Sequence, residues 1–272
     1  MTSPFRSYPG MVGGLLLLIV GVAALFGPWL APYDPQQFHP QVRLQGPSAA
    51  HWLGTDQFGR DILSRLLHGA PSTVFFGIGA TLLGVAAGTI IGVIAGVAGR
   101  WVDSVIMRII DGFLAVPDLL FTLLIVTILG GGMGHAMLAV AVAFTPGMAR
   151  IARSAVLSIR TREYVLAAVA RGESSVYIVG REVMPNAMGP IIVEATIRVS
   201  FAIMIGATLG FLGLGAQPPS TEWGLMVAEA RQFMFRNPWM VVVPGIAIAL
   251  AAMGFNLFGD ALRDSLDVRR SH

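Results

Sequence analysis

The stretch STVFFGIGATLLGVAAGTIIGVIAGVA, residues Ser72–Ala98, decides the fold class because it contains no charged residue. A helix needs about 20 mostly apolar residues to cross the hydrocarbon core of a membrane. A chain in lipid must also pair its backbone N–H and C=O groups internally, which favours a helix. We therefore predict that this stretch is one membrane-spanning helix of a larger bundle.

Five other apolar stretches have the length of a membrane span. The charge-free stretch Leu119–Ala149 is interrupted by a glycine-rich turn at residues 130–134, which we interpret as the boundary between two spans. The N-terminal stretch lacks the small-residue cleavage site of a signal peptide, so we expect an uncleaved helix. The sequence thus predicts an all-α polytopic membrane protein with six transmembrane helices, at approximately Met11–Leu30, Ser72–Ala98, Gly112–Leu129, Gly134–Ala149, Ala187–Gly213 and Trp239–Gly259.

The composition of the 272-residue chain agrees with a membrane protein and excludes several kinds of chemistry. Hydrophobic residues make up 55% of the chain and charged residues 12%, whereas a soluble domain has about 25% charged residues. There is no cysteine for a disulfide or thiolate site, and all 18 basic residues are arginine, so no lysine can serve a nucleotide phosphate loop. We expect no catalytic residue, no metal site and no cofactor site. The net charge of +3 is too diffuse to indicate nucleic acid.

The distribution of arginine predicts the orientation of the spans. Cytoplasmic loops of membrane proteins carry an excess of Arg and Lys. With the N-terminus inside, most of the 18 arginines fall on cytoplasmic segments, and Arg198 lies inside the fifth span. We therefore expect both termini in the cytoplasm, together with the long polar segment Arg150–Asn186.

The segment Arg150–Asn186 is too polar for the membrane and long enough for two short helices. The run Glu163–Ala170 consists mostly of good helix formers, and Gly172 suits the end of a helix. A second short helix, at about Ser174–Val183, is expected to stop at Pro185 because proline lacks a backbone N–H. Two small helices below a bundle could dock a cytoplasmic partner or could pack on their own bundle, and the spacing alone leaves both interpretations open.

This segment resembles the cytoplasmic coupling motif of ABC importer permeases, E-A-A-x3-G-x9-I-x-L-P. When Gly172 is aligned with the glycine of the motif, Ala167 and Ala168 fall on the two alanines, and Pro185 falls on the proline. The positions that depart from the motif hold Leu166, Glu182 and Met184 in place of Glu, Ile and Leu. We expect Glu163, one turn earlier, to take the acidic role. The resemblance implies that coupling to an ATPase depends on Glu163, Tyr164, Leu166, Ala167, Ala168, Gly172 and Pro185.

Three further stretches are similar to the C-type permease subunit of the dipeptide/oligopeptide/nickel subfamily. They are His51–Arg65, Phe211–Pro219 and Phe255–Asp260. The resemblance implies a type I ABC importer permease fold with cytoplasmic coupling helices. We divide the chain into residues 1–70, with the N-terminal tail, first span and outer loop, and residues 71–272, a permease core with five spans and a coupling loop at about 150–186.

The resemblance also implies partners and substrates. A second permease subunit would complete a heterodimer, two ATPase subunits would bind ATP and Mg, and an extracytoplasmic substrate-binding protein would deliver substrate. The chain would lie in the bacterial cytoplasmic (inner) membrane and import di- or oligopeptides, with nickel chelates or glutathione-like compounds as alternatives. The competing class is a secondary transporter, which should show inverted repeats or broken helices with ion-binding groups. The chain has no convincing internal repeat.

Two features inside the spans allow alternative interpretations. Span two carries Gly84, Gly88, Gly92 and Gly96 on one helix face, where small residues let helices approach closely. This face could contact the second permease subunit or could pack within the chain. Glu194 and Arg198 stand four residues apart in span five, and charges in a bilayer are functional-site hypotheses by default. The pair could line the translocation path and contact the termini of a peptide, or could neutralise itself at the permease interface.

Two outer segments are expected to lie at the membrane surface. In the first, Asp61 and Arg65 are spaced for an ion pair on a short amphipathic helix in the interface plane, capped by Thr55 or Asp56. In the second, Glu222–Arg236, the aromatic residues are expected to anchor the chain in the membrane. The alternative for both segments is a landing surface for the binding protein. The aromatic residues of the second segment are Trp223, Phe233 and Phe235.

Overall fold

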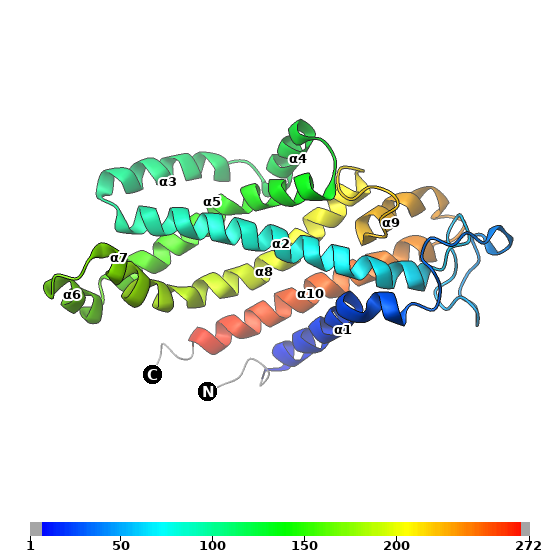
Figure 1. Cartoon of the computed structure of the whole chain (residues 1–272), viewed down its shortest axis with the longest axis horizontal. Coiled ribbons are helices and arrows are strands. Elements are labelled where there is room, and N and C mark those ends of the chain that lie inside the picture. The colour runs from blue at the N-terminus through cyan, green and yellow to red at the C-terminus, as the bar shows by residue number, and fades with distance from the viewer. Residues whose placement is uncertain (1–6, 268–272) are drawn as a thin grey trace.

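The computed structural model describes residues 7–267, which form an elongated bundle of helices (Figure 1). Within this range the β-structure consists of one isolated bridge, between Thr55 and Asp61. The elements are α1 (Tyr8–Leu30), η2 (Pro40–Val42), α2 (Ile62–Val97), α3 (Arg100–Leu114), α4 (Asp118–Leu129), α5 (Met133–Arg160), α6 (Glu163–Ala170), α7 (Ser175–Tyr177), η3 (Ile178–Val183), α8 (Met184–Phe211), α9 (Trp223–Ala230), η4 (Arg231–Phe233) and α10 (Trp239–Asp267).

The long helices confirm the prediction of a polytopic membrane protein. Five of the described helical stretches are long and apolar enough to cross a membrane, and the count is six if the bent pair α3 and α4 forms one span. The helices extend beyond the apolar windows because their polar ends continue the same hydrogen-bond pattern. For example, α2 begins at Ile62, ten positions before the predicted window, and α5 continues to Arg160.

The third span differs from the straight helix predicted over Gly112–Leu129. The chain bends by 88° between α3 and α4. Pro117 precedes the first residue of α4, and the residue before a proline is disfavoured in the helical region. The helix therefore stops at Leu114 and restarts at Asp118, and the shorter segment α4 projects away from the long axis of the bundle (Figure 1).

Helix α2 lies at the centre of the bundle. Its most extensive contact is with α5, and it also packs on α8 and α1, while α10 packs between α1 and α8. One buried cluster joins α2, α8, α9 and α10 around Ile203 and Trp223, and another joins α2, α5 and α8 around Phe144. The helices that follow the coupling segment and the helices that precede it therefore share one core.

The two ends of the bundle carry different structures (Figure 1). One end, which we call the α6 end, carries the short helices α6 and α7. The opposite end, which we call the α9 end, carries α9 and the irregular segment of residues 31–61. Helix α2 runs without a break through positions 70 and 71, so the predicted boundary between residues 1–70 and 71–272 lies inside a helix. The division itself stays a prediction.

Candidate functional site

Helix α6 ends as the sequence predicts. Gly172 follows the helix with a φ of 79°, in the left-handed region that glycine adopts without a Cβ clash. The Gly172 N–H donates to the carbonyl of Val169 at 2.9 Å, and the Glu173 N–H donates to the carbonyl of Ala168 at 3.2 Å. These two bonds form a Schellman motif, which satisfies carbonyls at the end of a helix and turns the chain sharply. The turn leads directly into α7.

The two faces of α6 have different environments. Val165 and Ala168 are buried against the chain itself, and Val165 belongs to a cluster with Ile159, Val183 and Ala187. The residues that face outward are apolar but exposed: the exposed fractions of Leu166 and Val169 are 55% and 56%. One face therefore packs on the bundle and the other is free in this chain, and docking of a partner on the free face stays a prediction. The outward set comprises Tyr164, Leu166, Ala167 and Val169.

The structure corrects the role expected of Pro185. A short helix was expected to stop there, but the chain from Ser175 to Phe211 continues as one helical stretch. Residues Ile178–Val183 form a π-helical segment, in which the Met184 N–H donates to the carbonyl of Val179, five residues earlier. Pro185 then lies in the first turn of α8, where its missing N–H is tolerated. The short helix α7 therefore continues through η3 directly into α8.

The predicted ion pair in span five forms inside α8. The Arg198 Nε lies 3.0 Å from the Glu194 Oε1. The guanidinium of Arg198 also lies over the Phe144 ring of α5, 5.0 Å from its centroid. A Cβ on Gly147 would lie 2.4 Å from the Arg198 Nη2, so the guanidinium packs directly against the α5 backbone at this glycine and would have to shift for any larger residue. The pair thus joins α8 to α5, and its role in transport stays a prediction.

Next to this pair is an open groove of about 780 Å³ between α8 and α10, toward the α6 end. Glu194 lines its α8 wall and Arg263 its α10 wall, and the amide residue Asn186 lies nearer the α6 end. Sequence reasoning did not place Arg263 near Glu194, because residues so far apart in sequence meet only through the packing of α10 on α8.

The glycine stripe of α2 packs within the chain. A Cβ on Gly88 would lie 2.5 Å from the Cβ of Met148, and one on Gly92 would lie 2.3 Å from the carbonyl oxygen of Ala149. Gly84 and Gly96 face the same helix, α5. The interpretation of this stripe as an interface with a second permease subunit is therefore wrong, because α5 of the same chain covers the face completely.

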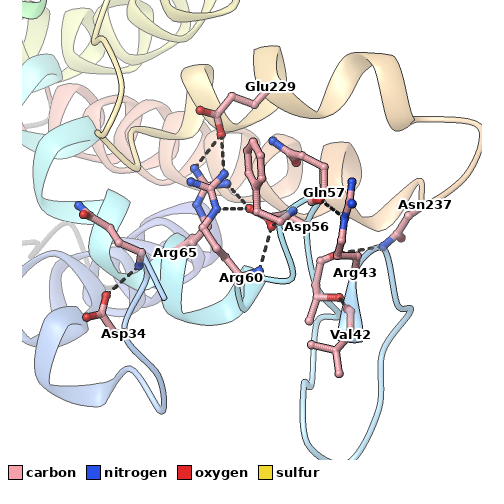
Figure 2. A network of polar contacts seen from close by, with 12 residues as sticks. Asp34, Val42, Arg43, Asp56, Gln57, Arg60, Arg65, Glu229 and Asn237 are labelled. Atoms are coloured by element: carbon pink, nitrogen blue, oxygen red, sulfur yellow. Dashed lines mark hydrogen bonds and ion pairs between the residues drawn. The ribbon is translucent and has the colours of Figure 1, made fainter. Parts of the chain in front are cut away.

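A buried polar network at the α9 end was missed by sequence reasoning (Figure 2). The Arg65 guanidinium bridges Asp56 and Glu229, with its Nη1 2.7 Å from the Asp56 Oδ2 and its Nη2 2.8 Å from the Glu229 Oε2. Arg60 contacts the same two carboxylates, at 2.5 and 3.2 Å. The network ties the start of α2 and the preceding loop to α9. Its only signal in sequence was the charged run within residues 51–65.

This network corrects the expectation of a separate surface helix. Asp61 caps the long helix α2 by accepting from the Ser64 N–H at 2.8 Å, and its other oxygen contacts the His51 Nδ1 at 2.9 Å. Arg65 does not pair with Asp61, because Asp56 and Glu229 hold its guanidinium. The segment is the buried first turn of α2 and not a separate helix.

The aromatic residues of the second outer segment divide into two groups. Trp223 is buried, and its Nε1 donates to the Leu66 carbonyl at 2.9 Å, so the expectation that it anchors the chain in the membrane is wrong. Phe235, in contrast, is 95% exposed. Beside Trp223, the buried Glu222 caps α9 by accepting from the Gly224 and Leu225 N–H groups at 2.9 Å. Burial raises the pKa of the Glu222 carboxyl despite these bonds.

The fold and this geometry define a multi-pass membrane protein with a helical loop whose apolar face is open at one end of the bundle. Comparison with known proteins identifies the class. Residues 88–272 match the family described as binding-protein-dependent transport system inner membrane component, and residues 5–47 match the N-terminal TM domain of oligopeptide transport permease C. The chain belongs to this family of transport-system membrane components, which excludes the alternative of a secondary transporter.

Individual relatives cover nearly the whole chain. The chain is 44% identical to the dipeptide transport system permease protein DppC of Alkalihalophilus pseudofirmus over 94% of its own length and 84% of that protein. It is 41% identical to the glutathione transport system permease protein GsiD of Escherichia coli, over 96% of its length and 87% of that protein.

The fold is also found in a solved transporter. An inward-facing structure of the MetNI methionine ABC transporter matches with a TM-score of 0.60 at 19% identity, over 74% of this chain and 95% of that one. A second inward-facing structure of the same transporter matches with a TM-score of 0.58. These matches confirm the predicted type I ABC importer permease fold, and the family match confirms the resemblance noted from the sequence.

Proposed function

We propose that the chain is the permease subunit of an ABC importer that moves di- or oligopeptides across the bacterial cytoplasmic membrane. The observation that carries the proposal is the similarity over more than nine-tenths of the chain to permeases of dipeptide transport systems. Glutathione is a second candidate substrate because glutathione permeases are about as similar. Glutathione is itself a small peptide, so both candidates require a path that accepts peptide backbones.

The proposed orientation places the α6 end in the cytoplasm, together with both termini. Loops on that side should be rich in arginine. The α6 end carries Arg100, Arg160, Arg162, Arg171 and Arg181, among others, whereas the α9 end carries fewer. The binding protein would then meet the α9 end, and the ATPase subunits would meet α6.

Coupling to the ATPases is proposed to depend on two sets of residues. The outward face of α6, with Glu163, Tyr164, Leu166 and Ala167, would contact an ATPase subunit. Exposed apolar side chains at the end of a protein are typical of an interaction surface. A second set, Ala168, Gly172 and Pro185, would act from within by holding α6 on the bundle and joining it to α8. Ala168 is assigned to support because it is buried, whereas Gly172 and Pro185 are exposed and are assigned by their positions at the end of α6 and the start of α8.

This arrangement provides a mechanism for transmitting force. The buried face of α6 packs on Val183 and Ala187, which belong to the helical stretch that continues into α8. Movement of a docked ATPase would therefore move α8, which carries Glu194 and Arg198. Because Arg198 is packed on Phe144 and Gly147, movement of α8 would change its contact with α5. Rigid-body rocking of packed helices is a common form of such transitions.

The proposed partners are a second permease subunit, two ATPase subunits and an extracytoplasmic binding protein. In this arrangement ATP and Mg are bound by the ATPases, and this chain contributes path and coupling surface. The chain itself would carry out no covalent chemistry. The helix faces of α8 and α10 that remain exposed within the described chain are available for the second permease subunit.

The test uses the whole transporter, assembled with its neighbouring subunits in a strain that lacks other dipeptide importers. Uptake of radiolabelled Ala-Ala, with and without excess glutathione, measures the substrate class. Leu166→Asp, on the outward face of α6, should abolish both uptake and co-purification of the ATPases. Phe235→Asp, an equally polar change at an exposed residue of the α9 end, should leave co-purification intact.

Two results would contradict the proposal. If the wild-type transporter takes up neither Ala-Ala nor glutathione, the assigned substrate class is wrong. If Leu166→Asp retains ATPase binding and uptake, the outward face of α6 is not the coupling surface.

A further inference from the structure

The groove between α8 and α10 begins where the two helices pack most closely. They run antiparallel, and a Cβ on Gly259 of α10 would lie 2.8 Å from the Ile197 Cγ1 of α8 (Figure 1). Nearer the α6 end, Leu266 of α10 approaches Gly189 of α8, and a Cβ added to Gly189 would lie 3.7 Å from the Leu266 Cδ1. Arg263 lies one helical turn beyond Gly259. Both Arg263 and Glu194 therefore lie between these two contact points, at a similar depth on opposite walls.

The two charges are not neutralised by each other. Glu194 uses its Oε1 for Arg198, and within residues 7–267 Glu194 forms no ion pair or hydrogen bond with Arg263. Arg263 is exposed at the groove, and the Glu194 side chain is 28% exposed. The groove thus presents a carboxylate on one wall and a guanidinium on the other, and each has capacity for a further partner.

The α8 wall offers a second acceptor two helical turns before Glu194, nearer the α6 end. Asn186, Pro190 and Glu194 are four residues apart and all line the groove. Because Pro190 has no N–H, the carbonyl of Asn186 lacks the donor that a regular helix would supply. A carboxylate and a main-chain carbonyl on one helix face are the groups that an ammonium ion requires as acceptors.

A second cavity shows what a purely apolar site in this chain looks like. It measures about 460 Å³ between α2, α3, α4 and α5, and Ile106, Phe113 and Phe121 are among its lining residues, with no charged residue. An acyl chain or an apolar helix would fit such a lining. The α8–α10 groove instead combines charges of both signs, which favours a small zwitterion over an apolar occupant.

We propose that this groove binds a peptide by its two termini, with the ammonium at Glu194 and the carboxylate at Arg263. This inference rests on the proposed function, from which it takes peptides as substrates. With the α6 end in the cytoplasm, the groove is the last site that a peptide occupies before release. Because α8 is continuous with the short helices beyond α6, ATPase movement would shift the Glu194 wall relative to Arg263 and change the fit.

The experiment uses the complete transporter, purified into lipid nanodiscs without the binding protein. Equilibrium binding is measured for Ala-Ala, for N-acetyl-Ala-Ala and for Ala-Ala-amide, with uptake of Ala-Ala measured in parallel. The variants are Glu194→Gln and Arg263→Gln. The matched controls are Asp264→Asn and Arg236→Gln, which neutralise exposed charges outside the groove.

Each groove variant should lose recognition of one terminus. Glu194→Gln should weaken Ala-Ala binding about tenfold and leave N-acetyl-Ala-Ala binding unchanged, because the acetylated peptide has no ammonium. Arg263→Gln should weaken Ala-Ala about tenfold and leave Ala-Ala-amide unchanged. The controls should bind all three peptides as the wild type does. Comparison of capped and free peptides separates terminus recognition from a general loss of folding.

Three results would overturn the inference. The first is that the wild-type transporter takes up Ala-Ala but shows no equilibrium binding of Ala-Ala in nanodiscs. The second is a pair of groove variants that weaken free and capped peptides equally. The third is loss of the second permease subunit from Glu194→Gln or Arg263→Gln, which would identify the groove as a subunit interface. If the wild type takes up neither Ala-Ala nor glutathione, the proposed function itself fails, and the groove assignment fails with it.

Discussion

The two ends of the bundle are held together by different kinds of contact. At the α9 end, Arg60 and Arg65 share two carboxylates in a network whose Arg65 and Asp56 side chains are each only 3% exposed. At the α6 end, α6 is seated by Val165 and Ala168, and its outward face is open. The first arrangement fixes irregular loops in one position, whereas the second leaves a short helix lightly held and ready for a partner.

Ion pairs along the bundle differ in energetic weight from the buried pairs at the α9 end. The Arg150–Asp111 pair, which joins α5 to α3, has side chains that are 55% and 56% exposed. Exposed pairs of this kind contribute about 0–1 kcal/mol. Removing one partner of a buried pair costs about 3–5 kcal/mol, because the other charge is left buried without compensation. Rigidity is thus expected to be concentrated at the α9 end.

The largest expected effect comes from Arg65→Leu. This change leaves Arg60 as the one remaining guanidinium that contacts Asp56 and Glu229, and it should lower the free energy of unfolding by at most about 3–5 kcal/mol. Thermal unfolding of the purified chain in detergent measures the loss. Arg236→Leu, at an exposed arginine of the same end, is the control and should change the stability by less than about 0.5 kcal/mol. If Arg65→Leu and Arg236→Leu lower the unfolding temperature equally, the buried network does not stabilise the α9 end.

This network also shows where prediction from sequence stops. The six apolar stretches are predictable because lipid requires each span to be a long apolar helix. The partner of Arg65 is not predictable, because Glu229 lies 164 positions away and meets it only when α9 folds onto α2. Local spacing favoured Asp61 as that partner, but Asp61 is already occupied as the cap of α2.

The same limit applies to the helix boundaries and faces of the candidate site. Gly172 was predicted correctly because a left-handed turn at a helix end depends only on local conformation. The helix end predicted at Pro185 was wrong, because the π-helical segment before it lets the helix continue although proline has no N–H. The four-glycine stripe was found in the sequence, but whether α5 or another subunit covered it depended on tertiary packing.

A matched pair of substitutions in α6 tests the difference between its buried face and its exposed face. Ala168→Leu forces a larger side chain into a fully buried position and should cost about 1–3 kcal/mol of stability through overpacking. Ala167→Leu, one residue earlier, points outward and should leave the unfolding temperature unchanged while lowering dipeptide uptake. Thermal unfolding and uptake are measured on the same preparations. If Ala167→Leu destabilises as much as Ala168→Leu, the two faces of α6 are assigned incorrectly.

A smaller effect is expected where α6 ends. Gly172→Ala places a Cβ in the left-handed region and should cost about 1–2 kcal/mol through backbone strain, since no atom lies within 4 Å of the added carbon. Limited proteolysis at residues 171–174 should become faster as the turn opens. Gly180→Ala is the control, because Gly180 is helical and its added Cβ also meets nothing. That change should protect the segment slightly, and faster cleavage in both variants would argue against strain at Gly172.

The last effect concerns Glu222 at the rigid end and, unlike the others, depends on pH. Burial raises the pKa of this carboxyl above its ordinary value of 4.5, so the folded state binds the proton more tightly than the unfolded state. The stabilisation from proton binding is complete below pH 4.5 and is lost as the pH rises through the folded pKa. The stability of the wild type relative to Glu222→Gln should therefore fall as the pH rises from about 5 to about 8, by at most about 1.4 kcal/mol per pH unit. Thermal unfolding across this range measures the difference. A difference that stays constant with pH would mean that the carboxylate is as well solvated at the α9 end as in the unfolded chain, and would weaken the case for a dry, rigid end.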